Sequence, residues 1–86
     1  MAGRPILSSD LAMVPVQCFL ARTALGWSER DLARAAKLSQ PAVRQFERGA
    51  PVRPSTIEAI QRALEEAGVI FIEAEDGGPG VRLRMR

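Results

Sequence analysis

Residues 25–49 read LGWSERDLARAAKLSQPAVRQFERG, and they contain the clearest structural pattern of the chain. Its first half predicts a short helix over residues 28–36. Ser28 is placed as the N-cap, and Asp31 stands three residues later, where the acid of a capping box bonds back to the cap. Lys37 and the residue after it then form a tight connection to the second half.

The second half predicts another helix, over residues 39–48. Ser39 is its expected N-cap. Val43 and Phe46 share one face of this helix, and polar side chains fill the opposite arc. Two short capped helices, the second apolar on one face only, are typical of a helix-turn-helix, here at residues 28–48.

Helices are also expected on both sides of this pair. Pro15 suits the first turn of a helix over residues 15–25, because its missing N–H is not needed there. After the pair, Ser55 and Glu58 form the Ser-x-x-Glu pattern of a capping box, which predicts a fourth helix that ends at Gly68.

The tail changes from helical to strand character. Residues 69–72, VIFI, are β-branched or aromatic, and residues 81–86 alternate between apolar residues and arginine. A turn cluster at residues 76–80 separates the two segments. This pattern predicts a β-hairpin over residues 69–86. Residues 1–14 show no clear period, and we expect them to form a loosely held arm.

Composition excludes several classes of site. The chain has 86 residues, no histidine and one cysteine, Cys18. It is long enough for one small domain. A disulfide within the chain, a Cys/His zinc site and a histidine-based catalytic triad are ruled out. We expect a cytoplasmic protein that is not an enzyme and that uses no metal or cofactor.

Charge divides the chain into a basic and an acidic part. Residues 22–53 carry seven Lys or Arg against three acidic residues, a net charge of +4. Residues 54–80 carry one Arg against six acidic residues, a net charge of −5. Such a split favours one surface that faces a polyanion and another that faces away from it, although ordinary solvated surface would also account for it.

The stretch from residue 25 to residue 49 resembles the DNA-binding core of phage repressors and Cro proteins, the XRE family. The resemblance extends over residues 15–68. It implies a mainly α fold, a four-helix lambda-repressor-like DNA-binding domain, to which the sequence adds the C-terminal β-hairpin. The residues that carry the resemblance are Gly26-Trp27-Ser28, Leu32-Ala33, Ala36, Leu38-Ser39, Val43 and Phe46-Glu47-Arg48-Gly49.

The resemblance implies roles for individual residues on and near the recognition helix, residues 39–48. Glutamine can pair with adenine and arginine with guanine, so these side chains suit base edges in the major groove. A phosphate contact or a solvated charge is the alternative for Arg44. The residues implied to contact bases are Gln40, Pro41, Arg44 and Gln45, and those implied to contact phosphates are Ser28, Arg22, Ser39, Arg48 and Arg53.

The family also pairs an arginine on the first helix with a glutamate near the end of the recognition helix, which here implies an Arg22–Glu47 pair. Two positions depart from the family pattern. Glu29 stands where glutamine is common, and its carboxylate repels phosphate. Lys37 stands where glycine is common, because the chain there often needs a positive φ.

The tail favours a dimer. Residues 69–72 are apolar on both faces of their strand, and a small hairpin cannot bury both faces against four helices. The remaining face or open edge is available to a second subunit. We expect a twofold homodimer through the hairpin, with the contact residues Val69, Ile70, Phe71, Ile72, Val81 and Leu83.

These features predict a sequence-specific regulator of transcription that binds double-stranded DNA, as a dimeric repressor on an inverted-repeat operator. Two alternatives remain open at this stage. The chain could be the antitoxin of a toxin–antitoxin pair, its tail holding a partner toxin or other regulator protein. It could also be a protein-interaction adaptor that kept the fold and lost DNA binding.

Overall fold

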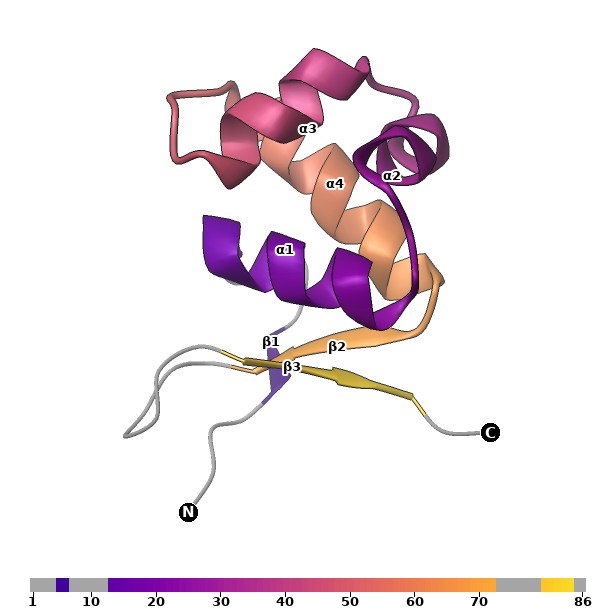
Figure 1. Ribbon diagram of the computed structural model, residues 1–86. Coiled ribbons are helices and arrows are strands. Elements are labelled where there is room, and N and C mark those ends of the chain that lie inside the picture. The colour runs from indigo at the N-terminus through magenta and orange to yellow at the C-terminus, as the bar shows by residue number, and fades with distance from the viewer. Residues whose placement is uncertain (1–4, 7–12, 73–79, 85–86) are drawn as a thin grey trace.

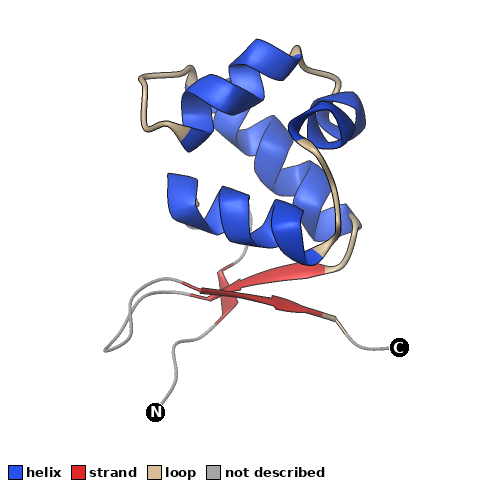
Figure 2. Cartoon of the chain, in the orientation of Figure 1, coloured by secondary structure: helices blue, strands red, loops and turns tan. Residues whose placement is uncertain are grey.

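The computed structural model describes residues 5–6, 13–72 and 80–84. Four helices form one body, and a small sheet lies as a second layer on the side of α1 away from α3 (Figures 1 and 2). The prediction of a mainly helical domain with a C-terminal hairpin is confirmed. In chain order the elements are β1 (Pro5–Ile6), α1 (Pro15–Ala24), α2 (Glu29–Ala36), α3 (Gln40–Glu47), α4 (Pro54–Glu66), β2 (Val69–Ile72) and β3 (Gly80–Leu83).

Local hydrogen bonds set the start of α2 and α3. The Ser28 hydroxyl accepts from the backbone N–H of Asp31 at 3.0 Å, and the Asp31 carboxylate accepts from the backbone N–H of Ser28 at 2.9 Å. This is the predicted capping box. The hydroxyl of Ser39 accepts from the backbone N–H of Ala42 at 3.3 Å, so Ser39 caps α3 as expected.

The capping box predicted for the fourth helix is wrong. The helix begins two residues earlier than that box requires, at Pro54, with Arg53 as its N-cap and no side-chain cap bond. Proline fits the first helical position because its φ is already helical and it has no N–H to satisfy. Ser55 therefore lies inside the first turn, and the Arg53 carbonyl accepts from the backbone N–H of Thr56 at 3.0 Å.

The turn between α2 and α3 has the left-handed geometry that the sequence position suggested. Lys37 adopts φ 59° and ψ 43°, and it is the one non-glycine residue with positive φ in the described part of the chain. A side chain in this region is strained by about 1–2 kcal/mol relative to the right-handed region. The turn keeps its shape without glycine because α2 and α3 are held together by packing on both sides of it.

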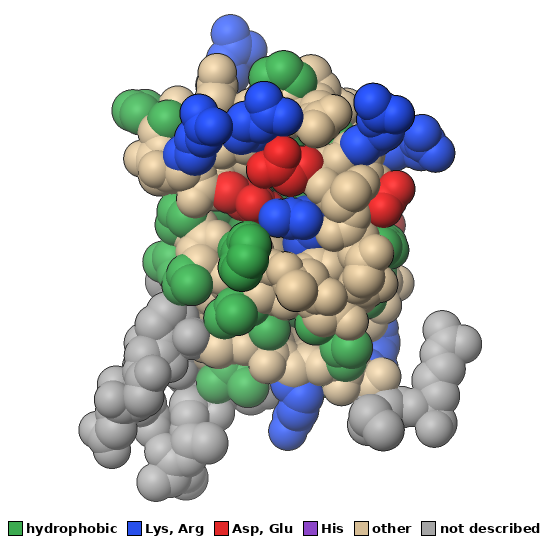
Figure 3. Space-filling view, viewed as in Figure 1, with side chains coloured by type: hydrophobic (Ala, Val, Ile, Leu, Met, Phe, Trp, Pro, Cys, Tyr) green, Lys and Arg blue, Asp and Glu red, His purple; other side chains and the backbone are tan. Residues whose placement is uncertain are grey.

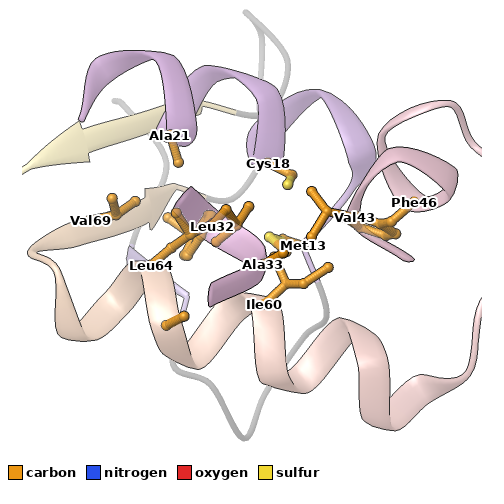
Figure 4. Packing of buried hydrophobic residues seen from close by; sticks show 12 residues of the cluster. Met13, Cys18, Ala21, Leu32, Ala33, Val43, Phe46, Ile60, Leu64 and Val69 are labelled. Carbon is orange, nitrogen blue, oxygen red and sulfur yellow. The ribbon is translucent and has the colours of Figure 1, made fainter. Parts of the chain in front are cut away.

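A single apolar cluster joins all four helices to β2 (Figure 4). The cluster lies between α1 and α4, with Leu32 and Ala33 of α2 in its middle, Val43 and Phe46 of α3 at one end and Val69 of β2 at the other. Buried apolar surface of this kind is the main driving force for folding. The buried members are Met13, Cys18, Ala21, Leu32, Ala33, Val43, Phe46, Ile60, Ala63, Leu64, Val69 and Phe71.

The sheet has three strands in the order β1-β2-β3, all antiparallel. The expected arm contributes the third strand, since Pro5 pairs with Ile72 and Ile6 with Phe71. A strand of two residues is too short to show an alternating pattern, so it could not be predicted from the sequence. The predicted turn cluster at residues 76–80 and the end of the tail fall mostly outside the described residues.

Two buried glutamines tie the helices to the segments around them. Gln17 of α1, 2% exposed, donates from Nε2 to the carbonyls of Ile72 at 3.2 Å and Gly80 at 3.1 Å. Its Oε1 accepts from the backbone N–H of Val14 at 2.9 Å. Gln61 of α4 accepts from the backbone N–H of Met13 at 3.2 Å. These bonds fix the hairpin and the start of α1 to the helical body.

Candidate nucleic-acid interface

Helix α3 has one buried face and one free face. Val43 is fully buried and Phe46 is 4% exposed, so both side chains are held in the core. On the opposite side Pro41, Arg44 and Gln45 are exposed. The major groove of DNA is about 12 Å wide and admits one helix, so a helix anchored in this way can enter it with its exposed face.

The residues implied to contact bases all lie on α3. Gln40 and Pro41 occupy the first two helical positions, and Gln40 is half-buried. Arg44 and Gln45 follow one turn later, so the four side chains occupy neighbouring positions along one arc. In the space-filling view, Lys and Arg side chains gather over α2 and α3, with acidic side chains between them (Figure 3).

The two cap residues have their hydroxyls in use. Ser28 and Ser39 are exposed, and each accepts a hydrogen bond from a backbone N–H of the helix it begins. The N-terminal turn of α3 has no acidic residue, so the positive end of its helix dipole favours an anion such as phosphate, whereas the first turn of α2 already carries Glu29 and Asp31.

An ion pair connects α1 to the end of α3. Arg22 donates from Nε to one carboxylate oxygen of Glu47 at 2.8 Å and from Nη2 to the other at 3.0 Å. Nη1 of Arg22 donates to the carbonyl of Trp27 at 3.0 Å. The side chains are only 14% and 8% exposed, so the pair is partly withdrawn from solvent. Its hydrogen bond to Glu47 raises the pKa of Arg22, which stays charged.

The Glu47 carboxylate also contacts the thiol of Cys18. Cys18 is fully buried, and its Sγ donates to Glu47 at 3.3 Å. Burial raises the pKa of the Cys18 thiol well above its ordinary range, and the charge of Glu47 raises it further. The thiol therefore stays protonated and serves as a small buried side chain.

Arg48 and Arg53 lie at the ends of the loop between α3 and α4. Arg48 is the C-cap of α3 and Arg53 the N-cap of α4, and both are exposed. Arg53 and Gln45 of α3 both line an open groove of about 500 Å³. The groove is lined by Ala42, Gln45, Pro51, Val52, Arg53 and Thr56.

One contact within this surface was not anticipated. Nε of Arg44 donates to Oε1 of Glu29 at 3.3 Å, which links the free face of α3 to the first residue of α2. In the sequence, Glu29 stands out only as a departure from the family pattern. No local signal joins residues 15 positions apart on different helices.

The residues expected at a dimer contact divide into two groups. Val69 is 3% exposed and Phe71 is fully buried, so both are used inside the subunit. Val81 and Leu83 pair with these residues on the same face of the sheet and are half-buried. Ile70 and Ile72 project from the other face and are also half-buried.

A second apolar surface lies on α1, and it was not predicted from the sequence. Val16 and Phe19 are each 49% exposed, with Val14 at 41% and Leu20 at 39%. The guanidinium carbon of Arg22 stands 5.5 Å from the centre of the Phe19 ring, within the range of a cation–π contact. Green side chains in Figure 3 mark apolar surface on the side of the molecule where α1 lies.

The buried and free faces of α3, with α2 packed across it, define a DNA-binding domain of the helix-turn-helix class. A family model described as helix-turn-helix matches residues 20–67, more than half of the chain. The chain therefore belongs to this family of DNA-binding regulators, in its XRE-type branch. No curated protein matched the sequence. Among the residues that the structure describes, none of the helices is long and apolar enough to cross a membrane.

Proposed function

We propose that this protein is a sequence-specific repressor of transcription that binds an inverted-repeat operator as a dimer, with α3 in the major groove. The observation that carries the proposal is the free face of α3, where Pro41, Arg44 and Gln45 are exposed above a buried apolar face. Glutamine and arginine are the side chains that pair bidentately with adenine and guanine. Repression follows when the bound protein covers a promoter.

In this proposal the surrounding cations and caps position α3 on the DNA backbone. Arg48 and Arg53 follow α3 directly and contact phosphates, as do Ser28 and Ser39 through the helix starts that they cap. Arg22 on α1, held by Glu47, is the fifth residue proposed to contact phosphate. Contacts of this kind carry no sequence information, and they make affinity fall steeply with salt.

Binding of random duplex DNA across a salt series tests the backbone contacts. Arg53→Gln should weaken binding to all sequences alike and reduce the salt slope by about 1, because one phosphate contact is lost. Arg62→Gln is the matched control, because Arg62 is exposed on α4 and belongs neither to the proposed DNA contacts nor to the proposed dimer contact. Equal effects of the two variants would contradict this orientation.

The dimer is proposed to form through the outer face of the sheet, at Ile70 and Ile72. That face points away from the helices, which leaves α3 of each subunit free for its half-site. Sedimentation equilibrium should give a dimer that Ile70→Lys dissociates. Val16→Lys, on the apolar surface of α1, should leave it intact. A monomeric wild-type protein, or a dimer dissociated by Val16→Lys alone, contradicts the proposed interface.

A further inference from the structure

Glu29 and Arg44 form the one contact between charged side chains of α2 and α3 in the described part of the chain. Nε of Arg44 donates to Oε1 of Glu29 at 3.3 Å. The side chain of Arg44 is 45% exposed and that of Glu29 is 25% exposed. An ion pair this open to solvent contributes little to stability. The contact therefore matters mainly because it restricts the conformation of the Arg44 side chain.

The contact leaves the recognition end of the guanidinium free. Glu29 holds Nε, and no other side chain in the described residues bonds to Nη1 or Nη2 of Arg44. Those two groups form a planar fork of donors, which matches O6 and N7 of guanine. A free arginine has many rotamers, and a contact that restricts them beforehand lowers the entropy lost on binding.

The position of Glu29 favours this role over a direct DNA contact. It is the first residue of α2, where the helix dipole stabilises a carboxylate. Its charge repels phosphate, and the oxygen that faces Arg44 is already in use. An arginine held by Nε next to a phosphate-repelling carboxylate is directed toward the groove floor and away from the backbone.

We propose that Glu29 is a positioning residue that presents Arg44 to a guanine in each half-site. The inference rests on the proposed function, because it requires that α3 reads bases. It goes further by naming the base and by assigning to α2 a share in its recognition. A carboxylate at this position is then a determinant of sequence preference, although it contacts no DNA.

The test is selection from a pool of random duplex DNA with the wild-type protein and three variants, Glu29→Ala, Glu29→Gln and Arg44→Ala. Wild type should enrich guanine at one position of each half-site. Arg44→Ala should abolish that preference, and Glu29→Ala should reduce it about tenfold, within the range for one bidentate contact. Glu29→Gln keeps an oxygen that accepts from Nε and should retain most of the preference.

Preferences at the remaining positions separate positioning from a simple change of charge. Loss of the Glu29 carboxylate should raise affinity for all DNA slightly, whereas the loss of guanine preference should occur at one position only. Glu58→Ala removes an exposed carboxylate from α4 and should leave every base preference unchanged. Circular dichroism checks that each variant is folded.

The outcomes distinguish this proposal from the one on which it rests. If wild type enriches no sequence, the proposed function itself fails. If wild type enriches a site and Arg44→Ala alters it, but Glu29→Ala keeps the guanine preference within about twofold, α3 reads bases and the role of Glu29 is wrong. If Arg44→Ala changes no base preference, the assignment of guanine to Arg44 is wrong as well.

Discussion

Arg22 of α1 and Glu47, the last residue of α3, form a two-point ion pair with N–O distances of 2.8 and 3.0 Å. The pair joins the first helix to the far end of the helix proposed to read DNA. Glu47 also accepts from the buried thiol of Cys18, so one carboxylate satisfies groups on two neighbouring turns of α1. The orientation of α3 in the domain thus depends on a contact 25 residues apart in the sequence.

Replacement of Glu47 by glutamine should destabilise the protein by about 1.5–3 kcal/mol, the range for a hydrogen bond to a charged group. The guanidinium of Arg22 would remain partly buried without its opposite charge. Urea unfolding followed by circular dichroism measures the change. Glu58→Gln, at an exposed carboxylate on α4, is the matched control and should shift stability by less than about 0.5 kcal/mol. Similar values for the two variants would contradict the structural role of the pair.

Gln17→Met should loosen the hairpin more than the helices. The variant keeps the side-chain length and leaves the carbonyls of Ile72 and Gly80 without their donor, at a cost of about 1–3 kcal/mol. Hydrogen exchange should show the greatest loss of protection in β2 and β3. Ala33→Gly destabilises the interior of α2 by about 1 kcal/mol and should show no such bias toward the sheet. Uniform loss in both variants would contradict the prediction.

Lys37→Gly should raise stability. The left-handed conformation at φ 59° costs a residue with a side chain about 1–2 kcal/mol, and glycine removes this cost. Glycine also makes the unfolded chain more flexible, which lowers the stability by about 0.4–1 kcal/mol. We expect a net gain of about 0.5 kcal/mol in urea unfolding. Arg34→Gly is the control, because the same substitution inside α2 should cost about 1 kcal/mol. A less stable Lys37→Gly protein would show that the turn is not strained.

Asp31 should contribute stability that depends on pH. The backbone N–H of Ser28, and then its hydroxyl, lower the pKa of the Asp31 carboxyl below its ordinary value. A lowered pKa in the folded state gives stability that is present above about pH 4 and is lost as pH falls through the folded pKa. The difference in urea midpoint between wild type and Asp31→Asn should therefore be larger near pH 6 than near pH 2.5. A difference that is constant with pH would contradict this reading, and Glu58→Gln supplies the reference.

The parts of the fold that could be predicted are those fixed by chemistry within one or two helical turns. Ser28 and Asp31 are three residues apart, and Val43 and Phe46 share a face because of helical periodicity alone. The start of the fourth helix was predicted wrongly because two signals lie next to each other. Ser55 suits the N-cap and Pro54 suits the first helical position, and the helix begins at Pro54.

The parts that could not be predicted join residues far apart in the sequence. Gln17 bonds to Gly80 across 63 positions, and no pattern in either segment marks that partner. Glu29 meets Arg44 only once α2 and α3 are packed against each other. Arg22 and Glu47 are 25 positions apart, and their pair was expected only because the sequence resembles a family in which that pair occurs.

The most direct test of the account is selection of random duplex DNA by the full-length protein, followed by a salt series on the enriched sequence. We expect an inverted repeat with half-site centres about 10 base pairs apart and an affinity that falls steeply with salt. No enriched sequence, with only weak salt-dependent binding, would mean that α3 does not read bases and that the protein is not a sequence-specific regulator.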